Sequence, residues 1–437
     1  MKKGISTIPK IFFTVTLFFL ISAISNAQLP SFPQKNKSAI VHARIHIGNG
    51  EVIEDGTVVF EKGKILYVGT DPQAHPDAKD RVDTRGAELY PGFIALGTGV
   101  GLEEISQVKA TLDIRELGRY NPNLRTLIAY NTDSRVIPTL RSNGVLTAQV
   151  APEGGVISGQ SSVFKMDGWN WEDAVLEADE AIWLNWPQMQ NQGGWSAEPD
   201  RSSPNDQYRV ELDGLVDYFR KARAYHEGRE AEKLEIHLGY EAMKGLWTGK
   251  KKLFVRVGEA KAMMQCVQVC ESLGLKPVLF GAADAWKIAD FLKEKSIPVV
   301  LQKTHSLPSR TDEDVWQTYK TPAILKKAGV LFAISQSGFW EQRNLAFQAG
   351  HTIGHGLSKE EALHSITLDA ARILGLENRM GSIEKGKDAT FFISSGDALD
   401  MRGQNLSKAY ILGAETDLND MHKQLYKKYQ TKYGQSN

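Results

Sequence analysis

Residues 91–375 repeat one order of elements, a short apolar segment followed by a helical pattern. Examples are GVLTAQVAP at 144–152 and PVLFGAADAWKIADFLKEKS at 277–296. A strand followed by a helix, repeated along the chain, is typical of parallel β/α units whose strands are buried on both faces. The order predicts an α/β protein with a (β/α)8 TIM-like barrel as its largest part.

The two flanking parts alternate apolar and polar residues and contain frequent glycines. They include IVHARIHIGNG and GTVVFEKGKILYVG before the barrel, and MGSIEKGKDATFFISSGDAL after it. This pattern predicts short antiparallel strands, and the simplest topology joins both ends into one small β-sandwich. The expected parts are a signal peptide (1–27), the N-terminal part of the sandwich (28–90), the barrel (91–375), the C-terminal part of the sandwich (376–416) and a C-terminal helix and tail (417–437).

Residues 1–27 have the features of an export signal. Lys2, Lys3 and Lys10 give a positive start, IFFTVTLFFLISAIS is an apolar run, and SNA before Gln28 is a small-residue cleavage site. The run is shorter than the roughly 20 residues that span a bilayer, and no later segment is comparably apolar. We therefore expect secretion across the inner membrane, into the periplasm, with no membrane anchor.

The charge balance gives no indication of nucleic acid as a partner. The chain has 52 basic and 52 acidic residues, and the signal removes only lysines, so the mature chain is slightly acidic. The last stretch, TDLNDMHKQLYKKYQTKYGQSN, predicts a polar helix that ends in a basic tail. We interpret it as a solvated appendage, with binding to a membrane surface as the minor alternative.

Five tryptophans lie close together between residues 167 and 204: Trp169, Trp171, Trp183, Trp186 and Trp195. The favoured interpretation is a helix, WEDAVLEADEAIWLNW, which packs its aromatic side chains on the barrel and precedes a mobile loop. The alternative is an aromatic lid over an apolar or sugar ligand. The preceding GVISGQSSVFKMDG has no Gly-x-Ser-x-Gly elbow, so we expect a strand-to-loop turn there and no nucleophile.

Three segments suggest a known family. They are GLSKEEALHSITLDAARILGLENRMGSIEKGKDATFFI, IVHARIHIGNGEVIEDGTVVFEKGKILYVG and AELYPGFI. Together they resemble the amidohydrolase superfamily, and within it the imidazolonepropionase-like branch, over nearly all of the mature chain. The resemblance implies hydrolysis of non-peptide or dipeptide C–N bonds, with one or two divalent metals at the C-terminal mouth of the barrel. A metal-bound water would be the nucleophile, and an Asp of the last strand would accept its proton.

The side chains that the resemblance assigns to the metal are missing from this sequence. By local motif, the five positions hold Gly97, Gly99, Arg256, Phe280 and Gln336 or its neighbour Ser335. The two glycines stand where Pro-Gly-Phe-Ile-Asp-x-His-x-His places a histidine pair, and the others replace the fifth-strand His, the sixth-strand His and the last-strand Asp. Glycine, arginine and phenylalanine do not ligate metals, so we expect no metal cofactor.

The fourth-strand ligand has no matching motif in LEIHLGYEAMKG, where the candidates are Glu235, His237 and Lys244. Three further histidines are interpreted as surface or packing residues, with a metal role as the minor alternative: His351, His355 and His364.

Four polar residues follow or end barrel strands and are expected to line a cleft with a positive bias: Arg256, Gln302, His305 and Gln336. Such a cleft would hold a carboxylate or a peptide-like ligand. For His305, a plain loop position is the favoured interpretation.

Three functions follow from these observations. The favoured one is an exported, catalytically degenerate member that acts as a binding or partner subunit, whose partner is a small molecule or an active homologous subunit in an oligomer. The alternative is an active hydrolase with zinc or another divalent metal in a rebuilt site, acting on a small amide, cyclic amide or dipeptide-like substrate. The third is a scaffold whose barrel mouth is filled by Phe280 and the tryptophan segment.

Overall fold

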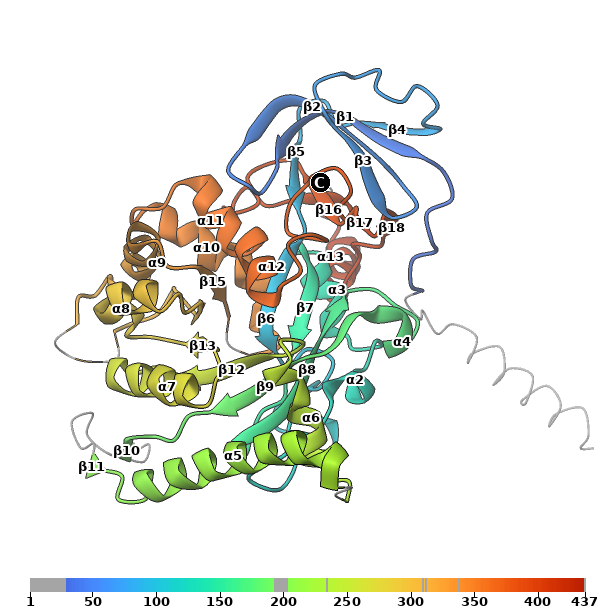
Figure 1. Ribbon diagram of the computed structural model, residues 1–437. Helices are drawn as coiled ribbons and strands as arrows, with labels where there is room; N and C mark the ends of the chain where they lie inside the picture. Colours follow the sequence, from blue (N-terminus) through green and yellow to red (C-terminus); the bar gives the residue numbers. More distant parts are fainter. Residues whose placement is uncertain are drawn as a thin grey trace, which may run out of the picture. The chain divides into compact units, whose positions relative to one another are not determined.

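Two eight-stranded sheets organise the chain, a nearly closed barrel and a separate sheet domain (Figure 1). The computed structural model describes residues 29–191, 203–232, 235–308, 310, 313–336 and 338–435. The signal peptide predicted at 1–27 and Trp195 lie outside the described residues. Residues from Ser31 onward form one unit, to which the description below refers.

The barrel sheet has the order β15-β14-β13-β12-β9-β8-β7-β6. Its strands are β6 (Phe93–Thr98), β7 (Val145–Val150), β8 (Ile157–Lys165), β9 (Val175–Asn185), β12 (Lys252–Val257), β13 (Pro277–Gly281), β14 (Val299–Gln302) and β15 (Phe332–Ser335). The prediction of a TIM-like barrel is confirmed.

Helices flank the barrel strands (Figure 1). The α-helices are α2 (Thr126–Ala129), α3 (Val136–Arg141), α4 (Trp171–Ala174), α5 (Tyr208–Glu232), α6 (Leu238–Trp247), α7 (Ala260–Ser272), α8 (Ala289–Glu294), α9 (Gln317–Ala328), α10 (Leu345–Ile353), α11 (Lys359–Ser365), α12 (Leu368–Leu374) and α13 (Met421–Lys432). Short 3-10 helices are η1 (Lys109–Thr111), η2 (Ala285–Ile288) and η3 (Glu341–Asn344). Within the described part of the chain, no helix is long and apolar enough to cross a membrane.

Strand β8 departs from the expected parallel barrel. It pairs antiparallel with both β7 and β9, whereas the other neighbouring strands of this sheet run parallel. Only residues 151–156 connect β7 to β8, too few for the crossover of about a dozen residues that a parallel neighbour needs. The segment expected to be a strand-to-loop turn is therefore a buried strand, in which Ser158, Ser161 and Ser162 are all buried.

The prediction of a helix over WEDAVLEADEAIWLNW is wrong for most of that segment. Helix α4 ends at Ala174, and strand β9 begins with Val175. Strands β8 and β12 pair with the two edges of β9, and this pairing outweighs the helical propensity of the Glu and Ala residues in the segment. Trp183 consequently points into the barrel interior and is fully buried.

The two end strands of the barrel order, β15 and β6, meet through a side chain. The hydroxyl of Ser335 donates a 2.6 Å hydrogen bond to the carbonyl oxygen of Leu96. This bond lies at the position where the family places its last-strand Asp. Ser335, which the resemblance places at the last-strand Asp, therefore connects the two edges of the sheet.

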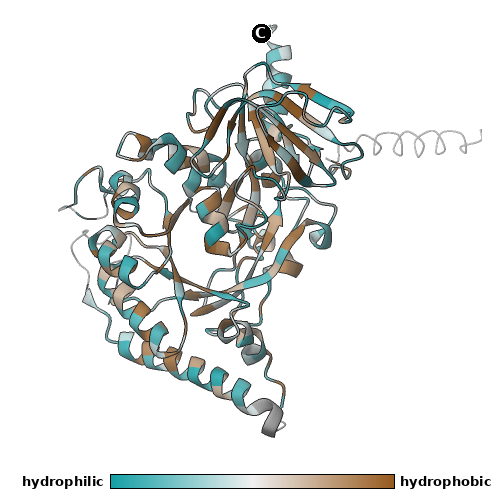
Figure 2. Ribbon diagram, turned by 45° about the horizontal axis from the view of Figure 1, so that its top comes forward, coloured by the Kyte–Doolittle hydropathy of each residue, from teal (hydrophilic) through white to brown (hydrophobic). Residues whose placement is uncertain are grey.

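Apolar side chains fill the barrel interior, and its strands are among the most hydrophobic segments in Figure 2. The cluster contains Ile94, Leu96, Ala151, Val163, Ala181, Trp183, Phe254, Val278, Phe280, Val300 and Ala333. Barrels of eight strands are packed in this way, with layers of side chains in place of a pore.

The sheet domain has the order β18-β17-β16-β5-β1-β2-β3, with β4 paired to β1. Its strands are β1 (Ser38–His46), β2 (Val52–Glu61), β3 (Lys64–Gly69), β4 (Asp80–Asp83), β5 (Glu88–Pro91), β16 (Phe391–Ser394), β17 (Leu406–Ile411) and β18 (Ala414–Thr416). The antiparallel pair β5–β16 joins the two ends of the chain. The prediction that both ends build one β domain is confirmed, and their strands form one hydrogen-bonded sheet.

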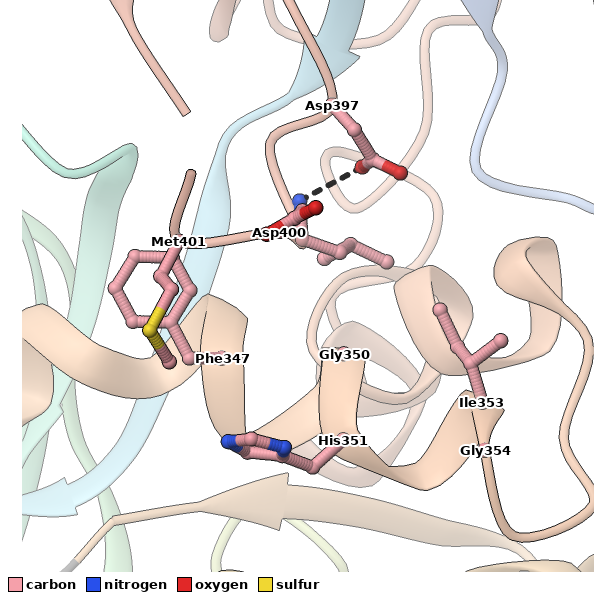
Figure 3. Close-up of a pocket in the computed structure, with 9 residues that line it drawn as sticks. Phe347, Gly350, His351, Ile353, Gly354, Asp397, Asp400 and Met401 are labelled. Atoms are coloured by element: carbon pink, nitrogen blue, oxygen red, sulfur yellow. Dashed lines mark hydrogen bonds between the residues drawn. The ribbon is translucent and has the colours of Figure 1, made fainter. Parts of the chain in front are cut away.

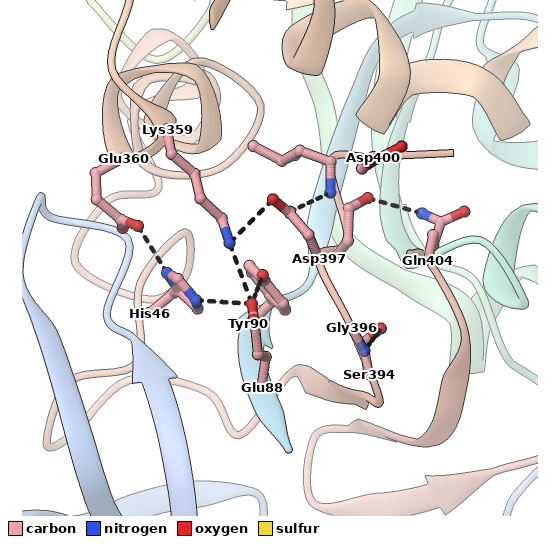
Figure 4. Close-up of polar contacts among 12 residues, drawn as sticks. His46, Glu88, Tyr90, Lys359, Glu360, Ser394, Gly396, Asp397, Asp400 and Gln404 are labelled. Atoms are coloured by element: carbon pink, nitrogen blue, oxygen red, sulfur yellow. Dashed lines mark hydrogen bonds and ion pairs between the residues drawn. The ribbon is translucent and has the colours of Figure 1, made fainter. Parts of the chain in front are cut away.

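A charged network connects this sheet to helix α11 (Figure 4). His46 of β1 is buried, with Nδ1 2.6 Å from Glu360 and Nε2 3.1 Å from Glu88. Its ring stacks on Tyr90, whose hydroxyl donates to Glu88. Lys359 contacts Glu88 at 3.1 Å. The two glutamates thus lie at opposite nitrogens of one buried ring.

Candidate functional site

The mouth of the barrel, where its parallel strands end, contains a cleft of about 550 Å³. Its lining residues are Glu103, Glu104, Ser106, Glu153, Gly338, Phe339, Trp340 and Glu341. They come from the segments that follow β6, β7 and β15. Ligands of this fold bind at the same end of the barrel, so the cleft is in the position of an active site. Four carboxylates give it a negative lining.

Gly97, at the first position of the missing histidine pair, has no room for a side chain. A Cβ there would lie 2.6 Å from Cε2 of Phe280 and 2.7 Å from Cη2 of Trp183. The backbone φ of Gly97 is +63°, a left-handed conformation that favours glycine. The two aromatic rings occupy the space that a metal-binding histidine would need.

Gly99, the second position of the pair, is crowded as well. A Cβ there would lie 2.5 Å from Cδ1 of Ile114. Ile114 is buried and comes from the long segment between β6 and β7. The missing histidines are therefore replaced by apolar packing at both positions.

Phe280, which replaces the sixth-strand His, belongs to an aromatic cluster. The rings of Trp183 and Phe280 meet edge to face at 5.0 Å, and Trp183 stacks on Phe254 at 4.8 Å. Both geometries are favourable for aromatic pairs. Phe280 and Trp183 thus pack against each other in the barrel interior.

Arg256, which replaces the fifth-strand His, lies over this cluster. Its guanidinium carbon is 4.3 Å from the centre of the Trp183 ring, a cation–π geometry. It donates a 2.8 Å hydrogen bond to the carbonyl of Pro152 and longer ones, of 3.4 Å, to Ser158 and Asn185. Arg256 therefore connects β12 to the segment after β7, which also supplies a carboxylate to the cleft.

The charge of Arg256 has no carboxylate partner within 4.0 Å among the residues that the structure describes. Burial lowers the pKa of its guanidinium to about 10, and the more distant Glu153 opposes this effect. The side chain remains cationic at neutral pH. Glu153 is the next residue after Pro152 and lines the cleft, so Arg256 is hydrogen-bonded to the segment that supplies this carboxylate.

The last-strand position gives no base. Ser335 is fully buried in its bond to Leu96, as described above. Gln336 is also buried, and its carbonyl accepts a 2.6 Å hydrogen bond from the amide nitrogen of the Gln342 side chain.

These side chains do not fit the divalent metal of the family. Among the residues with a described position, no group of three or more His, Cys, Asp or Glu side chains is arranged to hold a metal ion. A catalytic zinc needs about three protein ligands, and a guanidinium beside the site repels a cation. For the fourth-strand candidates, Glu235 is exposed, His237 caps α6 through the backbone nitrogen of Tyr240, and Lys244 lies on that helix.

Of the four residues expected to line a positive cleft, Gln302 and Gln336 lie near each other, because Gln302 on β14 pairs with Ser335 on β15. Arg256 has no hydrogen bond or ring contact with Gln302, His305 or Gln336 in the described structure. His305 is exposed and its ring lies 4.6 Å from that of His351. Arg256 contacts the segment after β7 through Pro152, and Gln336 belongs to the segment after β15.

The remaining histidines have packing roles in the described structure. His364 is buried and 2.7 Å from Asp369. His351 lies near both His305 and His355, and burial, followed by these two rings, lowers its pKa. His351 also lines a second groove, of about 340 Å³, between α10 and the loop at Asp397–Met401 (Figure 3). This groove lies outside the barrel mouth.

A buried carboxyl group was missed by sequence reasoning. Glu180 of β9 lies inside the barrel and accepts hydrogen bonds of 2.6 Å from both Ser161 and Gln149. Ser161 also accepts a 2.7 Å bond from the indole of Trp183. Burial raises the pKa of Glu180 to about 7, although the two hydrogen bonds oppose the shift. The strand ADEAIW carries no pattern that marks this Glu as buried.

The architecture defines a class, a TIM-like barrel with an attached sheet domain built from both ends of the chain. The profile of the Amidohydrolase family matches residues 337–423. An amidohydrolase from Thermotoga maritima MSB8 is 25% identical with a TM-score of 0.76, and the match covers 87% of this chain and 100% of that chain. The C-terminal part of the chain thus matches the Amidohydrolase family, and the chain as a whole is similar in structure to an amidohydrolase.

More distant structures share the fold. A prolidase complexed with N-methylphosphonate-L-proline is 15% identical with a TM-score of 0.52, over 87% of this chain and 99% of that one. Ochratoxinase of A. niger is 13% identical with a TM-score of 0.51, over 87% of this chain and 95% of that one. No curated protein matches the sequence.

Proposed function

We propose that this protein is an exported, catalytically degenerate amidohydrolase that acts as a binding or partner subunit. The observation that carries the proposal is at Gly97, where Phe280 and Trp183 occupy the space of the first metal-binding side chain. If only one metal-binding side chain had been lost, a single substitution would restore the site. Here the position is filled by a packed aromatic cluster, and the neighbouring cation, Arg256, disfavours a metal as well.

The ligand that suits the mouth carries both an amine and a carboxylate. The four glutamates of the cleft favour a cationic group, and Trp340 and Phe339 offer aromatic surface beside it. Arg256, bonded to the segment that carries Glu153, supplies a charge that is not neutralised by a described carboxylate. A dipeptide-like or amino-acid-like molecule meets both requirements. That a prolidase of the same fold binds an L-proline derivative is consistent with this choice.

Location and assembly follow the same proposal. The signal at 1–27 takes the chain across the inner membrane into the periplasm. There the partner is either the small molecule or an active homologous subunit in an oligomer. A rebuilt active hydrolase is the competing function, because carboxylates remain at the mouth and a loop movement would be required to bring them together on a metal.

Metal content and hydrolysis separate these functions. The purified chain is incubated with zinc, freed of unbound metal and measured by elemental analysis, and a dipeptide panel is tested for zinc-dependent hydrolysis. The proposal expects well below one equivalent of zinc and no hydrolysis. One firmly bound equivalent together with zinc-dependent hydrolysis would establish the rebuilt enzyme and end the proposal.

Binding is tested with the same dipeptides by calorimetry. Arg256→Met is expected to weaken binding of any dipeptide that the natural chain holds by about tenfold or more, since a charged hydrogen bond is lost. Arg402→Met, an exposed arginine in the sheet domain, is the matched control and should leave binding unchanged. Unchanged binding in Arg256→Met would remove the carboxylate from the proposed ligand.

A further inference from the structure

Helix α13 is attached to the rest of the chain at its beginning and buries none of its residues. Its N-cap, Asp420, accepts a 2.6 Å hydrogen bond from Ser142, and the ring of His422 lies 5.6 Å from that of Trp340. Beyond this point the helix projects from the rest of the chain, with the C-terminus at its end (Figure 2). Helices of about 12 residues are marginal in water. A helix without a buried face is therefore expected to gain stability from a surface that it contacts.

One side of α13 is apolar and aromatic. Met421, Leu425, Tyr429 and Tyr433 follow one another at intervals of four, which places them along one side of the helix. Tyr426 lies beside this stripe. The five side chains are between 38% and 66% exposed. Scattered exposed apolar residues are ordinary, but a continuous stripe of them marks an interaction surface.

Lysines border the stripe, and no acid accompanies them. Four exposed lysines occur in the helix: Lys423, Lys427, Lys428 and Lys432. At 100° per residue, Lys428 and Lys432 lie along one border of the stripe, and Lys423 and Lys427 lie on the face opposite to it. From Met421 to Asn437 the sequence contains no Asp or Glu, in a chain with equal numbers of acids and bases overall. The positive charge is therefore concentrated on this helix.

We propose that α13 lies in the surface of an anionic lipid bilayer. The helix would place Met421, Leu425 and Tyr429 at the boundary between headgroups and acyl chains, while the lysines contact lipid phosphates. This is the arrangement of interfacial amphipathic helices, and tyrosine is enriched at that depth. Charge complementarity favours anionic lipid as the occupant, because all four lysines lie at one border of the stripe or on the face opposite to it, where lipid headgroups would be. The proposal does not depend on the function of the barrel mouth.

The test uses the purified chain and large unilamellar vesicles, either of phosphatidylcholine or of a mixture with about one third phosphatidylglycerol. Sedimentation at low salt is expected to show binding to the anionic vesicles alone, falling as salt is raised. Replacing the four lysines by glutamine (K423Q, K427Q, K428Q and K432Q together) is expected to lower partitioning by about 100-fold or more, since each lysine contributes roughly fivefold. Leu425→Ser with Tyr429→Ser, which leaves the charge unchanged, is expected to weaken binding by about tenfold.

A matched control removes four exposed cations from another helix. Arg209, Arg220, Lys221 and Arg223 of α5 are all exposed, and their replacement by glutamine changes the net charge by the same amount. This variant should bind the anionic vesicles within about threefold of the natural chain if α13 is the surface. Equal losses in the two quadruple variants would show general charge attraction and overturn the proposal.

Self-association is the competing occupant of the stripe. Light scattering of the natural chain is expected to show no dimer formed through the stripe, and so no dimer that disappears when the α13 lysines are replaced. A salt-sensitive dimer that the α13 lysine variant abolishes, with no binding to anionic vesicles, would overturn the lipid proposal in favour of a second copy of this chain. Unaltered thermal unfolding of each variant confirms that the fold is intact.

Discussion

Phe280 takes the place of a side chain at Gly97, since a Cβ on Gly97 would lie only 2.6 Å from its ring. By the resemblance, the two positions correspond to the family's sixth-strand and first-strand metal ligands, and the residues at these positions depend on each other sterically. A phenylalanine needs a glycine opposite, and the glycine in turn leaves a space that the phenylalanine and Trp183 fill. Restoring one histidine would therefore disturb packing before it offered a nitrogen to a metal.

Gly97→Ala is expected to lower the free energy of unfolding by about 2–4 kcal/mol, measured by urea denaturation. The left-handed backbone and the contact with Phe280 both contribute. Gly249→Ala separates them, because Gly249 has a similar φ of +73° but open space around it, and should cost about 1 kcal/mol. In a Phe280→Leu background the cost of Gly97→Ala should fall by about 1 kcal/mol or more. Strict additivity would contradict the packing relationship.

Glu180→Gln is expected to change how stability depends on pH. The pKa of Glu180 is raised from 4.5 to about 7 in the folded chain by burial. Between these values the folded state binds more protons than the unfolded state, so stability falls as pH rises from about 4.5 through 7. Removing the carboxyl group should remove a loss on the order of 2–3 kcal/mol between pH 4 and pH 9. Glu177→Gln, at an exposed position of the same strand, controls for the change in charge. Parallel stability curves for natural chain and Glu180→Gln would contradict the expected shift.

Glu88→Gln tests the network in Figure 4, and its expected effect on the pH dependence of stability is opposite to that of Glu180. Burial opposes ionisation of Glu88, but hydrogen bonds from Tyr90 and Lys359 outweigh it and lower the pKa. The stabilisation is present above pH 4.5 and is lost as pH falls through the lower, folded value. At pH 7 the variant should be about 1–3 kcal/mol less stable, because His46 and Lys359 lose a charged partner. The difference should shrink at pH 3. Glu54→Gln, an exposed partner of Arg44, should change little at either pH.

The parts of the fold that the sequence predicts are those with strong local patterns. Alternation in the two terminal segments and the strand–helix order of the middle lead to the sheet domain and the barrel. The glycines at 97 and 99 also stand out from the sequence alone. The reason they are tolerated, an aromatic cluster made by Trp183, Phe254 and Phe280 from three different strands, depends on contacts between residues far apart in the chain.

The errors have the same origin. The helical propensity of WEDAVLEADEAIWLNW favours a helix. After the short helix α4, however, pairing with β8 and β12 turns the rest of the segment into strand β9. The reversed direction of β8 follows from a short connection that carries no sequence signal of its own. The acidic lining from Glu103, Glu104, Glu153 and Glu341 could not be predicted from strand ends, because it forms only where the segments after β6, β7 and β15 come together.

Two buried arginines provide a last test, of whether Arg256 serves binding or structure. Arg141 pairs with Asp167 at 3.3 Å, and so Arg141→Met leaves a buried carboxylate uncompensated and should cost about 3–5 kcal/mol. Arg256 has no carboxylate partner within 4.0 Å among the described residues, and burial disfavours its charged form. Arg256→Met should therefore change the free energy of unfolding by less than about 1 kcal/mol, because relief of desolvation offsets the lost contacts with Pro152 and Trp183. If the guanidinium of Arg256 adds little to the stability of the fold, its presence at this position is better explained by a ligand that it binds. A cost for Arg256→Met as large as that for Arg141→Met, in urea unfolding at pH 7, would make Arg256 a structural residue.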